Sequence, residues 1–277
     1  MVNIDFGRGP ARFGTSLGGA TEYRYDNSGA QGTPNDGSYT IAKTTAGMNS
    51  GWYTIANHTP NTPDGYMMVV NVDKDPGIFY ESQIPIDLCQ NTTYEFAAWV
   101  VNILRNDGVE PNITFEILDM TGKVLGRYDT GNIPDRDPNW RKYGFLFQTT
   151  SSARVRIRMI SNVHNPTGAG GNDLAIDDIT FRACGPVITS KFTNNSSAVQ
   201  NLCEGESEDY AFAADVQGSP TLQFQWQVNR DKGGWSDIPG ENARTMTRSF
   251  TNADDGLYEY RFTVAEPGNF NSINCRT

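Results

Sequence analysis

Two adjacent carboxylates, Asp177 and Asp178, are the residues of this sequence best suited to chemistry. They lie near the start of a predicted strand within the stretch 170–184, which opens on a glycine-rich polar turn. Asn172 and Asp173 stand just before that strand and add two more oxygen-bearing side chains. Such a set favours a hard cation, and calcium is the first candidate because it takes oxygen ligands from several segments at once.

Alternation along the strand decides which of the two carboxylates points inward. Side chains of a strand point to opposite faces in turn, so Asp177 is expected on the apolar face with Ala175, Ile179 and Phe181. A carboxylate on that face is costly unless a cation or hydrogen-bond donors meet it. Asp178 is expected on the other face. The alternative to a metal site is that water solvates Asp178 and that Asp177 caps backbone amides.

Four cysteines, at positions 89, 184, 203 and 275, show no zinc-type spacing. Three pairings are possible, and four free thiols are the alternative. If a domain boundary falls near 186–200, Cys89–Cys184 and Cys203–Cys275 each stay within one domain. We favour this pairing, which indicates an oxidising compartment.

Aromatic residues are the candidates for ligand binding, because a flat ring can stack on the C–H face of a pyranose. Trp99 shares a predicted strand face with Glu95, and Glu116 lies on the polar face of another strand. One concave sheet carrying all three would form a glycan groove. The alternative places the tryptophans in the core. The wider aromatic set is Trp52, Tyr53, Trp140, Tyr23 and Tyr25.

A basic row on one strand face consists of Arg154, Arg156 and Arg158. It could grip an acidic polysaccharide through bidentate hydrogen bonds. The simpler prediction is an ion ladder with Glu95 or Glu116 on neighbouring strands.

Catalysis finds little support in the sequence, so we predict that the protein is not an enzyme. The only histidines are His58 and His164, and no nucleophile motif or phosphate-binding loop occurs. A glycan-active enzyme would need two carboxylates, which Glu95 and Glu116 could supply.

Composition limits the partners. The 277 residues carry a net charge of −10, with a pI of about 4.7, which argues against nucleic acid. No apolar run approaches the roughly 20 residues of a membrane span. The sequence opens without a signal peptide, so we expect a monomeric piece of a larger secreted protein.

Short alternating segments with turn residues between them predict an all-β fold. The clearest are 94–101, 112–118, 140–147 and 154–159. The pattern ends near Pro186, which gives one domain over 1–186 and a second over 187–277.

The first domain resembles the MAM-type jelly roll, an extracellular adhesion fold also met in surface proteins of gliding bacteria. Three stretches carry the resemblance: Ile4-Asp5-Phe6, the segment from Trp52 through Asn57-His58-Thr59 to Met67, and Ala175–Cys184. The first lacks the family's Cys and Glu, and Asn57 replaces its usual Asp. A fourth stretch, 88–100, resembles the bacterial version. Together they cover roughly residues 3–186.

The same final Asp-Asp strand occurs in the carbohydrate-binding jelly-roll modules of glycanases. In both families a calcium ties the first strand to the last. The resemblance therefore implies a structural calcium on Asp5 with Asp177 or Asp178, supported by Asn172 and Asp173. It does not separate adhesion from sugar binding.

The second domain resembles bacterial immunoglobulin-like domains. Trp226 follows Cys203 by 23 residues, as a core tryptophan would, and Asp255–Tyr258 matches a tyrosine corner. Tyr260 stands where an antibody domain has its second Cys, and the last strand is expected to be missing.

We therefore predict an all-β protein: a jelly roll stabilised by a structural calcium, followed by an immunoglobulin-like sandwich. The predicted function is non-catalytic binding to a glycan or protein ligand at a bacterial cell surface. A carbohydrate-binding module is the alternative, and a glycan-active enzyme is the third hypothesis. Ligand contacts are expected from Trp99, Glu95, Glu116, Trp52 and Tyr53.

Overall fold

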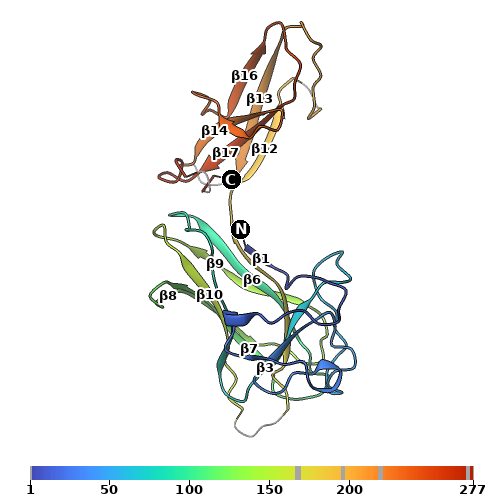
Figure 1. The fold of residues 1–277 in the computed structure, drawn as a ribbon. Coiled ribbons are helices and arrows are strands. Elements are labelled where there is room, and N and C mark those ends of the chain that lie inside the picture. The colour runs from blue at the N-terminus through green and yellow to red at the C-terminus, as the bar shows by residue number, and fades with distance from the viewer. Residues whose placement is uncertain (1, 166–169, 195–196, 218–220, 273–274, 277) are drawn as a thin grey trace. The chain divides into compact units, whose positions relative to one another are not determined.

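A computed structural model describes residues 2–165, 170–194, 197–217, 221–272 and 275–276. The chain forms two compact units (Figure 1). The first contains Met1–Leu88 and Thr93–Ala183, and the second contains Cys89–Thr92 and Cys184–Thr277. Apart from two short 3₁₀ turns, Gly18–Ala20 and Ala30–Gly32, the regular elements of these units are strands. The all-β prediction is confirmed. No helix in the described ranges is long and apolar enough to span a membrane.

The first unit contains a seven-stranded and a four-stranded sheet. The seven-stranded sheet has the order β2-β3-β4-β11-β6-β9, and β1 pairs with β11. Its strands are β1 (Val2–Ile4), β2 (Arg24–Tyr25), β3 (Ser38–Ala42), β4 (Met67–Asn71), β6 (Thr93–Asn102), β9 (Arg141–Gln148) and β11 (Leu174–Ala183). The four-stranded sheet has the order β5-β10-β7-β8. Its strands are β5 (Gly77–Gln83), β7 (Asn112–Asp119), β8 (Val124–Asn132) and β10 (Val155–Ser161).

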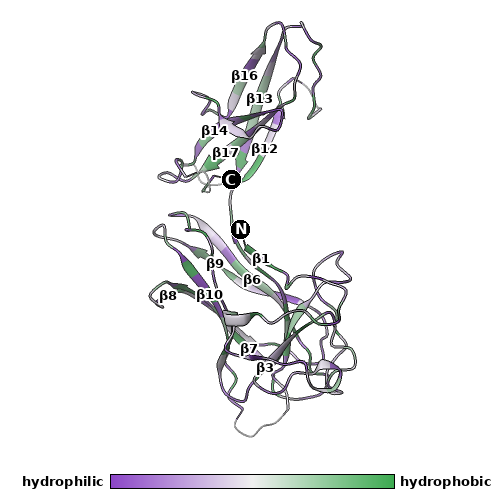
Figure 2. Ribbon diagram, in the orientation of Figure 1, coloured by the Kyte–Doolittle hydropathy of each residue, from purple (hydrophilic) through white to green (hydrophobic). Residues whose placement is uncertain are grey.

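The main core of the first unit lies between these sheets. Phe96 from the seven-stranded sheet and Phe115 from the four-stranded sheet are fully buried and meet edge to face. The alternation read from the sequence holds here, since Ile113, Phe115 and Ile117 all point into this core. Figure 2 follows the same alternation as hydrophilic and hydrophobic segments along β10. The buried apolar surface supplies the main driving force for folding.

A second apolar cluster covers the outer face of the seven-stranded sheet. The connection between β3 and β4 carries Met48, Trp52 and Ile55 onto Val69 and Val101. We call this connection, residues 43–66, the strap. Its packing means that this face of the sheet is not open to solvent along β3 and β4.

A β-bulge at Asp177–Asp178 overturns the predicted orientation of Asp177. The register passes from Asp177 opposite Trp99 to Thr180 opposite Ala97, so two residues of β11 face one of β6. Asp178 has a positive φ of 45°. Ile176 and Ile179 therefore both point into the main core, and Asp177 points outward, towards the strap.

The second unit contains two three-stranded sheets with the orders β12-β13-β16 and β15-β14-β17. The strands are β12 (Val187–Phe192), β13 (Glu208–Gln217), β14 (Gln223–Arg230), β15 (Trp235–Asp237), β16 (Thr245–Phe250) and β17 (Tyr258–Ala265). Trp226 is fully buried between them, and its indole N–H donates to the Ala243 carbonyl at 3.0 Å. The prediction of a core tryptophan at this position is confirmed.

The predicted disulfide pairing is wrong. Cys89 is bonded to Cys275, with the two Cα atoms 5.7 Å apart, while Cys184 and Cys203 are exposed free thiols. The reason is that Cys89–Thr92 packs as part of the second unit. The Asn269 amide donates to the Gln90 carbonyl at 2.5 Å and holds the same segment.

Candidate functional site

The two adjacent aspartates are hydrogen-bonded to the strap. Asp177 Oδ2 accepts hydrogen bonds from the backbone amides of His58 (2.7 Å) and Thr59 (3.3 Å), and Oδ1 accepts from the Asp178 amide (2.8 Å). Asp178 lies 2.7 Å from His58 Nδ1 and accepts from the Thr59 hydroxyl at 2.9 Å. Burial raises the pKa of Asp177 to about 7, although these amide bonds oppose the shift.

Asp173 holds the strap at a second point, Trp52. Its carboxylate is buried and accepts from the Trp52 indole N–H at 2.9 Å and from the Val72 amide at 3.2 Å. The neighbouring Asn172 donates to the Asp73 carbonyl at 3.2 Å. Desolvation by burial raises the pKa of Asp173 to about 7, against the effect of its two hydrogen bonds.

The five predicted calcium ligands therefore do not form one oxygen cage. Asp5 is exposed and accepts from the Gly7 amide at 3.0 Å. The other four, Asn172, Asp173, Asp177 and Asp178, already bond to protein groups. In the described ranges, no three His, Cys, Asp or Glu side chains gather in a way that could hold a metal ion. Calcium stays a prediction, which thermal melting with and without a chelator tests.

Trp52 and Tyr53 both belong to the strap. Trp52 is buried in the outer apolar cluster and is bonded to Asp173. The Tyr53 amide donates to the Ile103 carbonyl at 2.7 Å. The half-buried Tyr53 ring packs against the same apolar cluster, so both side chains contribute to packing.

Trp99 and Glu95 do share one outer strand face, as alternation predicted. Trp99 is partly exposed and stacks on His58 with ring centroids 3.9 Å apart. Glu95 accepts from Lys142 Nζ at 2.5 Å and Arg182 Nε at 2.7 Å. Burial opposes its ionisation, but these two cations lower its pKa below the ordinary value.

Glu116 lies apart from this pair, so the single groove of Trp99, Glu95 and Glu116 is not formed. Glu95 is on β6 of the seven-stranded sheet and Glu116 is on β7 of the four-stranded sheet. Each points away from the core between the sheets, since their strand neighbours Phe96 and Phe115 fill it. Alternation gives the face of each strand but not the sheet to which the strand belongs.

An ion ladder crosses the outer face of the four-stranded sheet. Arg158 pairs with Glu116 at 2.6 Å and with Glu81 at 3.7 Å, and Arg127 reaches Glu116 at 3.7 Å. The predicted ion ladder is confirmed in one pair, Arg158 with Glu116. Glu95 takes no part, and Arg156 pairs with Glu81 instead.

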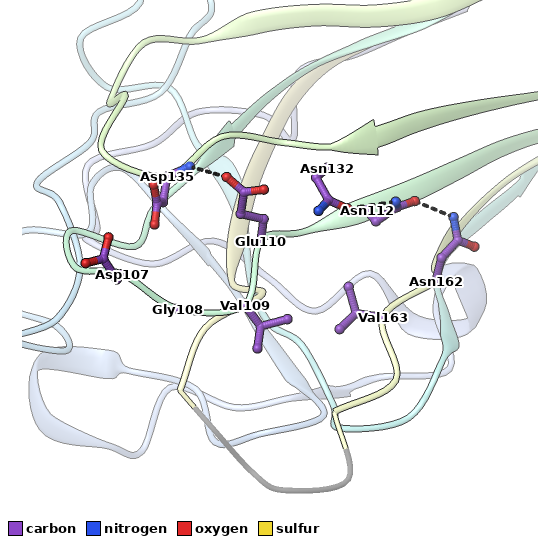
Figure 3. Close-up of a pocket in the computed structure, with 9 residues that line it drawn as sticks. All are labelled: Asp107, Gly108, Val109, Glu110, Asn112, Asn132, Asp135, Asn162 and Val163. Carbon is purple, nitrogen blue, oxygen red and sulfur yellow. Dashed lines mark hydrogen bonds between the residues drawn. The ribbon is translucent and has the colours of Figure 1, made fainter.

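A pocket of 540 Å³ opens at one end of the four-stranded sheet, where β7 begins and β8 and β10 end. It is lined by Asp107, Gly108, Val109, Glu110, Asn112, Asn132, Asp135, Asn162 and Val163 (Figure 3). This volume falls within the roughly 300–1,000 Å³ of small-molecule sites.

Three asparagine amides form a hydrogen-bonded row along this pocket (Figure 3). Asn162 Nδ2 donates to Asn112 Oδ1 at 2.8 Å, and Asn112 Nδ2 donates to Asn132 Oδ1 at 3.1 Å. Thr114 continues the row, 2.9 Å from Asn162 Oδ1. Each amide thus has a fixed orientation before any ligand arrives.

The carboxylates of the pocket are only partly used by the protein. Glu110 Oε1 accepts from the Asp135 backbone amide at 3.3 Å. No described residue donates to the second Glu110 oxygen or to the Asp135 carboxylate. This site was not predicted, because its only signal in the sequence is asparagine at the ends of three strands. Because β7 runs antiparallel to β8 and β10, its start lies beside their ends.

No family model matches the sequence, and no curated protein matches it. Among solved structures, the chain is similar to a CBM4 carbohydrate-binding module, with a TM-score of 0.29 and 15% identity over 43% of this chain and 70% of that one. It is also similar to the CBM22-1–CBM22-2 tandem domain of Paenibacillus barcinonensis Xyn10C. That TM-score is 0.33, with 9% identity over 96% of this chain and 84% of that one.

A third similar structure is the CBM22-1–GH10 portion of Clostridium thermocellum xylanase 10B, complexed with xylohexaose. The TM-score is 0.32, with 14% identity over 53% of this chain and 26% of that one. These structural neighbours contain carbohydrate-binding modules. At such scores and identities they assign no residue of this chain a role.

Proposed function

We propose that the first unit is a non-catalytic carbohydrate-binding module whose ligand occupies the pocket at Asn112, Asn132 and Asn162. The observation that carries this proposal is the fixed amide row beside carboxylates with open acceptor sites. A sugar hydroxyl both donates and accepts hydrogen bonds. Amides and carboxylates set at one edge of a rigid sheet can read several such hydroxyls at once.

Apolar contact is available in the same pocket. Val109 and Val163 line it between the polar groups (Figure 3). A saccharide ring has C–H faces as well as hydroxyls, so a pocket that mixes both surfaces suits it. The neighbouring structures named above are of this class, which we extend here to the chain itself.

A glycosidase role receives less support from the predicted acid pair. Glycoside hydrolysis requires two carboxylates roughly 5–10 Å apart across one bond. Glu95 and Glu116 lie on different sheets and each is held by cations. We therefore propose binding without catalysis. Release of reducing sugars from a neutral polysaccharide would instead support a glycosidase activity.

Adhesion at a bacterial cell surface is the context that we propose for such binding. A glycan-binding unit can hold a cell or a substrate without any chemistry. The Cys89–Cys275 disulfide supports an oxidising, extracellular compartment.

Isothermal titration after a screen on a polysaccharide array tests the function. We expect binding to at least one polysaccharide. The Asn132→Ala/Asp135→Ala double variant should lose about tenfold or more in affinity, because charged hydrogen bonds contribute about 1.5–3 kcal/mol. Lys123→Ala, in the exposed turn at the other end of β7, is the matched control and should bind like the wild type. Absence of binding across the array, or equal affinities for all three proteins, would contradict the proposal.

A further inference from the structure

The charges around the pocket are of one sign. Asp107, Glu110 and Asp135 line it, and none of its other lining residues is basic (Figure 3). The Asp135 and Glu110 oxygens described above face the pocket without a cationic partner among the described residues. A ligand that enters it therefore meets hydrogen-bond acceptors that are negatively charged at neutral pH.

Arg136 is the cation that the described residues bring to this group, and it already forms an ion pair. Arg136 pairs with Asp107 at 2.5 Å, and both side chains are largely exposed. This pair offsets one of the three lining charges. It leaves Glu110 and Asp135 as the uncompensated carboxylates.

The arginines of the adjacent sheet face cannot supply the missing positive charge. Arg127 is bonded to Asp129 at 3.1 Å and lies close to Glu116. Arg156 and Arg158 are committed to Glu81 and Glu116. Further along the sheet Arg154 pairs with Asp87 at 3.0 Å.

We infer that the pocket selects an uncharged saccharide and discriminates against glycans that carry uronate or sulfate groups. This inference rests on the proposed function and names its ligand class. Like charges brought together in an interface are a strong device for rejecting a wrong partner. The Asp135 carboxylate would repel an anionic group of the ligand. Of the polar side chains in the pocket, only the asparagine amides could donate hydrogen bonds to that group. We expect an acidic glycan to bind at least tenfold more weakly than its neutral counterpart.

Pairs of polysaccharides that share a backbone and differ chiefly in the charge of their substituents test the inference. The probes are hydroxyethyl cellulose against carboxymethyl cellulose, and methyl-esterified against de-esterified homogalacturonan. Each neutral polysaccharide found on the array is compared in the same way with an oxidised, uronate-bearing form. Affinity is measured by native affinity electrophoresis and by titration calorimetry on the full chain. The neutral member should bind more tightly, and the gap should narrow between about 20 mM and about 500 mM salt as the charges are screened.

Two variants should move the ratio of acidic to neutral affinity in opposite directions. Asp135→Asn removes one uncompensated charge and should raise this ratio several-fold. Arg136→Gln releases Asp107 from its partner and should lower the ratio. Circular dichroism of each variant checks that the fold is kept.

Failure of the inference and failure of the proposed function give different results. If a neutral polysaccharide binds but its acidic counterpart binds as well or better, the ligand class is wrong and the binding function stands. If acidic glycans alone bind, the inference is overturned in the same way. If neither member of any pair binds, the proposed function fails and the inference fails with it.

Discussion

The carboxylate of Asp177 accepts a hydrogen bond of 2.7 Å from the backbone amide of His58, which lies 119 residues earlier in the chain. This bond joins the strap to the last strand of the seven-stranded sheet. The His58 ring bonds to Asp178 and stacks on Trp99, so three contacts meet at one residue. The bulge in β11 makes this possible, because it presents both carboxylates to the strap.

Replacing Asp177 by Asn should destabilise the protein by about 2–3 kcal/mol. The substitution keeps the shape but places an amide N–H₂ group where two or three backbone donors converge, and buried donors left unsatisfied cost about 1–3 kcal/mol. Urea denaturation followed by tryptophan fluorescence measures the loss. Asp36→Asn, an exposed carboxylate in the same unit, should change stability by less than about 0.5 kcal/mol. Equal stabilities of the two variants would contradict the role of the bulge.

Asp173 should make the stability depend on pH between about 4 and about 7. Burial raises its folded pKa from 3.8 to about 7, so the folded protein binds a proton that the unfolded chain has released. The stability that this proton contributes is present below the unfolded pKa and is lost as the pH rises through the folded value. Unfolding free energies of wild type and Asp173→Asn, measured across this range, should converge or cross as the pH rises. Parallel curves would argue against a shifted Asp173.

Prediction from sequence succeeded where local periodicity decides the outcome. The strands around Phe96, Phe115 and Ile157 follow simple alternation, and their apolar faces form the core as expected. Prediction failed at Asp177, because one inserted residue in β11 shifts the alternation and no periodicity reveals it. The disulfide prediction failed for Cys89, because its partner depends on the unit to which Cys89–Thr92 belongs. Local sequence does not reveal that assignment.

The candidate site shows the same limit. Glu95 and Glu116 were placed correctly on polar strand faces, yet they belong to different sheets. The pocket depends on three strand ends meeting at one edge, which requires the strand order β10-β7-β8. Strand order is set by long-range packing rather than by local sequence.

Replacing Arg158 by Ala should cost about 2–4 kcal/mol of stability. Glu116 is buried, with 4% of its surface exposed, and Arg158 supplies its two closest charged hydrogen bonds, at 2.6 and 3.0 Å. Removing Arg158 leaves the buried Glu116 charge to the more distant Arg127, at 3.7 Å, whereas an exposed pair contributes at most about 1 kcal/mol. Arg154→Ala is the control, since both side chains of the Arg154–Asp87 pair are more than half exposed. Chemical denaturation of the two variants should separate them by at least about 1 kcal/mol.

The Cys89–Cys275 bond should be found by non-reducing peptide mapping, with Cys184 and Cys203 each alkylated before reduction. A Cys89–Cys184 peptide would contradict the structure.

Cys89→Ser/Cys275→Ser should destabilise the second unit by about 2–5 kcal/mol, because the bond closes a long loop and restricts the unfolded chain. Cys184→Ser/Cys203→Ser is the matched control, and it should unfold at the wild-type denaturant concentration. Reductant should lower the stability of the control and of the wild type alike, while leaving the Cys89→Ser/Cys275→Ser variant unchanged.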